Sequence, residues 1–68
     1  MVITVQCSTR HWSVLDPRAD DAIFYARGAD AFDAAAARAL EHHRRTGQHS
    51  TVRVEALGST VDALHIGG

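Results

Sequence analysis

The clearest structural pattern in the chain is DAFDAAAARALEHHRRTG, residues 30–47. Most of its residues are strong helix formers, and its apolar or small side chains recur at the three- and four-residue spacing of one helix face. Asp30 stands where an N-cap residue belongs, and Gly47 stands where a glycine ends a helix. The sequence therefore predicts a helix over residues 31–46. The predicted apolar stripe comprises Phe32, Ala35, Ala36, Ala39, Leu40 and His43.

Strand patterns flank this helix on both sides. Residues 2–8 alternate, with Ile3, Val5 and Cys7 on one face, and Trp12 and Val14 share a face of a second strand over residues 11–15. Residues 22–27, 51–57 and 60–66 are three further strand candidates. Because the connections between neighbouring strands are short, we expect antiparallel pairing.

The order of elements is thus strand, strand, strand, helix, strand, strand (β-β-β-α-β-β). It predicts one α+β domain over residues 1–68, an antiparallel sheet of four to five strands with one helix packed on one face. A single helix covers only one face of a sheet, so the other face is left to water or to a partner.

Composition excludes several classes of protein. The 68 residues are 46% hydrophobic with a net charge of -1, which is typical of a globular domain and not of a strongly basic nucleic-acid binder. The single cysteine, Cys7, forms no internal disulfide and is expected to be a small buried side chain. No secretory signal pattern and no apolar run of about 20 residues occurs, so we expect a cytoplasmic protein of a bacterial cell.

The pattern resembles a family of small bacterial domains of unknown function. The matching pieces are Trp12-Ser13-Val14 in the first hairpin, the alanines of the helix, Gly47, and the terminal His65-Ile66-Gly67. This resemblance implies a fold and not an activity. The acidic loop over residues 16–21 departs from the family, which often has a basic or glycine-rich turn there.

The size, composition and order of elements are also similar to those of some small anti-CRISPR proteins of phages and mobile elements. That resemblance implies an inhibitor that binds and occludes a bacterial CRISPR interference complex. It carries over no individual residue.

Motifs for catalysis and for cofactors are missing. The five histidines do not show paired zinc-ligand spacings, and His42 and His43 project about 100° apart on a helix. There is no glycine-bounded nucleophile turn and no glycine-rich phosphate loop. We therefore expect that the protein is not an enzyme and that it has no catalytic residue, no metal ligand and no cofactor.

Charge segregation is the most informative remaining feature. Residues 16–33 carry five aspartates and two arginines, whereas residues 34–54 carry four arginines and one glutamate. An acidic start and a basic end stabilise a helix, which is one explanation. The other is a surface of two signs that orients a protein partner. The candidate partner-binding residues are Asp16, Asp20, Asp21, Arg38, Glu41, Arg44 and Arg45.

The function that these observations favour is a non-catalytic protein-binding module, most concretely an inhibitor of the anti-CRISPR type. Two alternatives remain open. One is a nucleic-acid-binding domain that uses the arginines at positions 38, 44, 45 and 53. The other is a structural homodimer that pairs edge strands or buries the uncovered sheet face.

Overall fold

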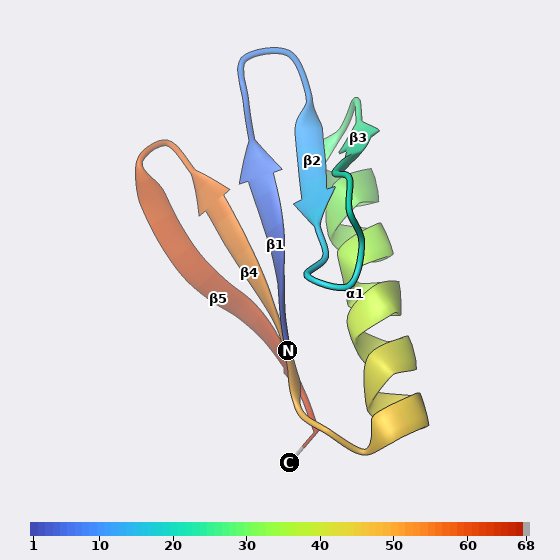
Figure 1. Cartoon of the computed structure of the whole chain (residues 1–68). Coiled ribbons are helices and arrows are strands. Elements are labelled where there is room, and N and C mark those ends of the chain that lie inside the picture. The colour runs from blue at the N-terminus through green and yellow to red at the C-terminus, as the bar shows by residue number, and fades with distance from the viewer. Residues whose placement is uncertain (68) are drawn as a thin grey trace.

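The computed structural model describes residues 1–67 and shows a five-stranded sheet with one helix on one of its faces (Figure 1). The predicted α+β class, the number of strands and the single helix are confirmed. The elements, in chain order, are β1 (Val2–Cys7), β2 (Trp12–Leu15), β3 (Ile23–Tyr25), α1 (Gly28–Thr46), β4 (Ser50–Ala56) and β5 (Ser59–Ile66).

The sheet is mixed, so the prediction of a purely antiparallel sheet is wrong. Its order is β3-β2-β1-β4-β5, and β1 pairs with β4 in parallel, whereas the other three pairs are antiparallel. The reason is the length of α1: 19 residues rise about 28 Å and return the chain to the end of the sheet where β1 begins. There the Thr51 amide donates to the Met1 carbonyl over 2.8 Å, so β4 starts beside β1 and runs the same way.

The core lies between α1 and the three central strands. Ile3 and Val5 of β1, Val14 of β2 and Val52 of β4 are buried against alanines of the helix. Because alanine side chains are short, the helix axis approaches the sheet closely and the core is thin. Side chains at its margin are half-buried: Met1, Trp12, Tyr25, Val54, Leu64 and Ile66.

The buried face of α1 differs in part from the predicted stripe. Ala35 and Ala39 are buried as predicted, but Leu40 is 39% exposed and His42 is buried in place of His43. The close approach of the helix leaves room only for the smallest side chains at the centre, so larger ones move to the flanks or outward.

The two ends of α1 differ in how well they were predicted. The helix begins at Gly28, and Arg27 is its N-cap residue. The Arg27 side chain makes no capping hydrogen bond in the described residues. Asp30 lies within the first turn of the helix, so the prediction that Asp30 is the N-cap is wrong. Gly47 has a φ of 72° and its amide donates to the His43 carbonyl over 2.7 Å, which confirms the predicted glycine terminus.

Gly28 is required by the close approach of Trp12. A Cβ atom at this position would lie 2.8 Å from two carbons of the indole ring. We expect Gly28→Ala to lower the free energy of unfolding by about 1–2 kcal/mol, because overpacking forces the ring or the helix start to move. Urea unfolding followed by far-ultraviolet circular dichroism, which also works in a variant without tryptophan, measures the loss. In a Trp12→Leu background the same substitution should cost much less, and an equal cost in both backgrounds would contradict the packing explanation.

The face of the sheet opposite α1 is uncovered, as predicted. Phe24 is exposed there and its ring stands edge-on to His11, with centroids 4.7 Å apart. Polar pairs cross the remaining strands: Gln6 donates to Glu55 over 2.9 Å, and Arg53 donates to Asp62 over 2.7 Å. This face is thus partly polar, which suits exposure to water.

Candidate functional site

The loop after β2 is fixed to α1 by Asp16. The alternation of β2 continues through Trp12 and Val14 to Asp16, so its side chain turns toward the helix and only 3% of it is exposed. Its carboxylate accepts hydrogen bonds from the Arg18 amide, Nε and Nη2 over 2.9, 3.3 and 3.1 Å. It also accepts one from Arg38 Nη1 of α1 over 3.2 Å. One carboxylate therefore holds two arginines from segments that are distant in the sequence.

The electrostatics of this cluster favour the charged carboxylate. Burial by itself raises the pKa of Asp16, but the hydrogen bonds and positive charge of Arg18, with the bond from Arg38, outweigh it and hold the pKa below its ordinary value. The hydrogen bond to Asp16 in turn raises the pKa of Arg18. Asp16 and Arg18 therefore form an ion pair at neutral pH.

This link holds the charged loop beside the charged side of α1, where Arg18 and Ala19 of the loop line one hollow with Arg38 and Arg45 of the helix. We call this area the loop–helix surface. Asp20 and Asp21 are exposed in the loop, Arg38 is half-buried, and Glu41 and Arg45 are exposed on α1. The members of the surface are Arg18, Asp20, Asp21, Arg38, Glu41 and Arg45.

The other two predicted site residues are placed differently. Asp16 is buried beneath the surface, where it serves as the link and not as an exposed charge. Arg44 is exposed on α1, but at 100° per residue it projects about 100° from Arg45 and away from the loop. Of the seven predicted residues, the structure places Asp16, Arg38 and Arg45 around one hollow between the loop and α1, whereas Asp20 and Asp21 line a second hollow on the other side of the loop.

Sequence reasoning missed His42 and Arg18. His42 is 9% exposed, its Nδ1 lies 3.5 Å from Arg18 Nη1, and its buried Nε2 has no partner in the described residues. The signal that could have found it is the spacing of Arg38, His42 and Arg45, which places all three on one side of a helix.

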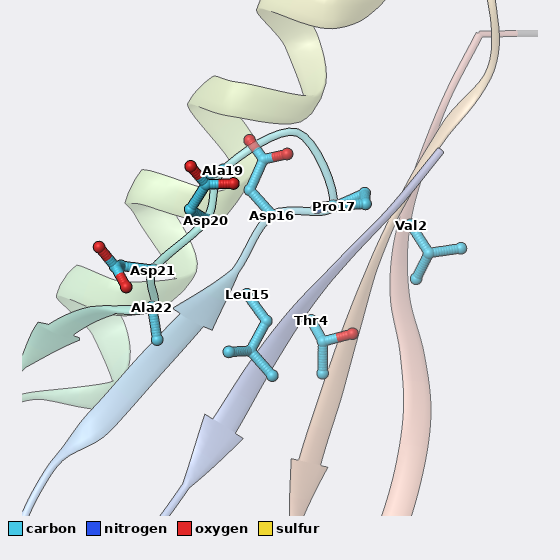
Figure 2. Close-up of a pocket in the computed structure, with 9 residues that line it drawn as sticks. All are labelled: Val2, Thr4, Leu15, Asp16, Pro17, Ala19, Asp20, Asp21 and Ala22. Atoms are coloured by element: carbon cyan, nitrogen blue, oxygen red, sulfur yellow. The ribbon is translucent and has the colours of Figure 1, made fainter.

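Two open hollows flank the loop. The first, of about 310 Å³, lies on the uncovered side of the sheet, where Val2, Thr4 and Leu15 point away from α1 while Asp16 points toward it (Figure 2). The second, of about 400 Å³, lies between the loop and α1, and we call it the arginine hollow. It is lined by Asp16, Arg18, Ala19, Arg38 and Arg45.

The described residues contain no cluster of three or more potential metal ligands, and Cys7 is half-buried and not in a disulfide. The one helix of residues 1–67 is not long and apolar enough to cross a membrane. Comparisons with protein-family models, with curated proteins and with solved structures gave no match.

Proposed function

We propose that the chain is a non-catalytic protein-binding module that contacts its partner through the loop–helix surface. The observation that carries this proposal is the burial of Asp16 between Arg18 and Arg38. It holds the acidic loop against the basic half of α1, so that charges of both signs have fixed relative positions. A preorganised pattern of this kind lowers the entropy lost on binding and favours one orientation of the partner.

The resemblance to small anti-CRISPR proteins indicates which partner to test first. Those proteins act by binding a bacterial interference complex, and a shallow, charged surface on a small rigid domain suits such a role. We therefore propose an interference complex, at its nucleic-acid or recruitment surface, as the first candidate partner.

The arrangement of arginines favours a protein partner over a nucleic acid. Arg53 lies on the uncovered side of the sheet in an ion pair with Asp62, far in the fold from the arginines of α1. On α1, Arg38 pairs with the carboxylate of Asp16, and Glu41 interrupts the arginines in the sequence of the helix. A continuous track of phosphates needs an uninterrupted row of positive charge, which this surface does not offer.

The proposal is tested by reversing the charge of the loop. We expect Asp20→Lys/Asp21→Lys to weaken partner binding at least tenfold, because it reverses the charge that the loop presents to the partner. The fold should stay intact, because both side chains are exposed in the loop. The measurement is capture from nuclease-treated lysates with and without an interference complex, followed by titration of the captured partner.

The matched control is Asp33→Lys/Glu55→Lys, which changes the net charge equally but lies outside the loop–helix surface. We expect it to bind like the wild type. Equal binding by the two double variants, or capture of no protein partner at all, would refute the proposal. Circular dichroism confirms that each variant is folded.

A further inference from the structure

We infer that the arginine hollow binds a carboxylate side chain of the partner, so that the partner presents an aspartate or glutamate to Arg38 and Arg45. This inference rests on the proposed function and names the chemistry of the group that the partner inserts.

Unused hydrogen-bond donors face the hollow. Arg38 gives only its Nη1 to Asp16, and its Nε and Nη2 have no partner within residues 1–67. Arg45 makes no hydrogen bond or ion pair within the same residues and yet lines the hollow. Both guanidinium groups therefore retain planar donor edges for an incoming acceptor.

The charge of the lining favours an anion. Three arginines line the hollow, and the buried Asp16 offsets one of their charges. Guanidinium groups match carboxylates in a two-pronged geometry, and Asp16 already shows this on the inner wall, where Arg18 Nε and Nη2 reach its two oxygens. A second carboxylate would meet Arg38 and Arg45 on the outer side in the same way.

The neighbours of the hollow restrict what carries this carboxylate. Asp20 and Asp21 directly follow Ala19, which lines the hollow, and they line the hollow next to it; Glu41 lies between the two arginines in the sequence of α1. These three carboxylates repel a polyanion that extends beyond the hollow. They attract lysine or arginine side chains of a partner that stand next to its single acidic side chain. The surface thus fits a protein segment in which one carboxylate is flanked by lysine or arginine.

The experiment is an NMR titration of the full, ¹⁵N-labelled chain with a short peptide, acetyl-AAEAKK-amide, and with its glutamine counterpart, acetyl-AAQAKK-amide. We expect the glutamate peptide to shift the Nε–Hε signals of Arg38 and Arg45, and the glutamine peptide to leave them unshifted. Inorganic phosphate and a twelve-nucleotide single-stranded DNA are the two further probes.

Two variants localise the effect. Arg45→Glu should weaken binding of the glutamate peptide at least tenfold, because it removes a donor that the fold does not use. Arg44→Glu makes the same charge change one residue away and should alter the affinity less than twofold. Equal shifts with the two peptides, or equal effects of the two variants, would overturn the inference. So would shifts of these signals by phosphate or DNA at concentrations at which the glutamate peptide produces none.

Failure of this inference can be told apart from failure of the proposed function. If a captured protein partner binds Arg45→Glu and the wild type equally, the binding function stands and the carboxylate site is refuted. If no partner is captured but the glutamate peptide binds at Arg45, the carboxylate site stands and the proposed function is refuted.

Discussion

Asp16→Ala is expected to lower the free energy of unfolding by about 2 kcal/mol. Removing one member of a buried ion pair commonly costs about 3–5 kcal/mol because the remaining charge is left without a partner. Here the loss is smaller, because the side chains of Arg18 and Arg38 are 38% and 34% exposed and can turn toward water. For a chain of this size the change corresponds to a fall in Tm of roughly 8–16 °C.

The pH dependence of this effect has a definite sign. The pKa of Asp16 is lowered in the folded chain from its ordinary value of 3.8, so the carboxylate stabilises the fold above that pH. The contribution is lost as the pH falls through the lower folded pKa. The difference in unfolding free energy between the wild type and Asp16→Asn should therefore be constant from neutral pH to about 5 and shrink below about 4.

The matched control is Asp62→Asn, which breaks the exposed pair between Arg53 and Asp62. We expect little or no loss of stability from it, because exposed ion pairs contribute little. Urea unfolding at several pH values, followed by Trp12 fluorescence, measures both variants. A pH-independent difference for Asp16→Asn, or an equal loss at Asp62, would contradict the structural role assigned to Asp16.

Asp16 also illustrates how far local patterns determine the site. The sequence Asp-Pro-Arg is typical of a loop, and this led to the prediction of an exposed acidic patch. The alternation of β2, however, extends one residue further, through Trp12 and Val14, and turns Asp16 toward α1. Its two partners, Arg18 and Arg38, are respectively two and 22 residues away. The second contact depends on where α1 lies over the sheet, which no local pattern encodes.

The pairing of β1 with β4 shows the same limit for the fold. Short turns predict which strands form hairpins, and these pairs were correct. The helix separates β3 from β4, so the position of β4 follows from packing and not from a turn. The chain places β4 beside β1, where Val52 joins Ile3 in the core. The length of a connection predicts only the pairing of strands joined by a short turn. It therefore could not predict the parallel pair of β1 and β4.

Ile3→Ala is expected to have the largest effect of all, a loss of about 3 kcal/mol in the free energy of unfolding. Ile3 is fully buried in β1, which lies between β2 and β4 and beneath α1. Truncating such a side chain removes its burial and leaves a cavity. The buried helix residues around the core are mainly alanines, which have no rotamers that could fill the space. The cavity can close only if the whole helix moves.

Such a movement would itself be costly, because α1 is held at its middle by the bond from Arg38 to Asp16 and at its start by the contact of Gly28 with Trp12.

The matched control is Val2→Ala, on the same strand but on the uncovered face, where the side chain is 36% exposed. We expect it to cost about 1 kcal/mol, because about two thirds of this side chain is buried and no enclosed cavity forms. A domain of 68 residues has a stability of roughly 3–10 kcal/mol, so the loss at Ile3 is a large part of the total. If Ile3→Ala lowered the free energy of unfolding by less than about 1 kcal/mol, the helix would have moved onto the sheet and closed the cavity. That result would contradict the rigid position of the loop–helix surface, on which the proposed binding depends.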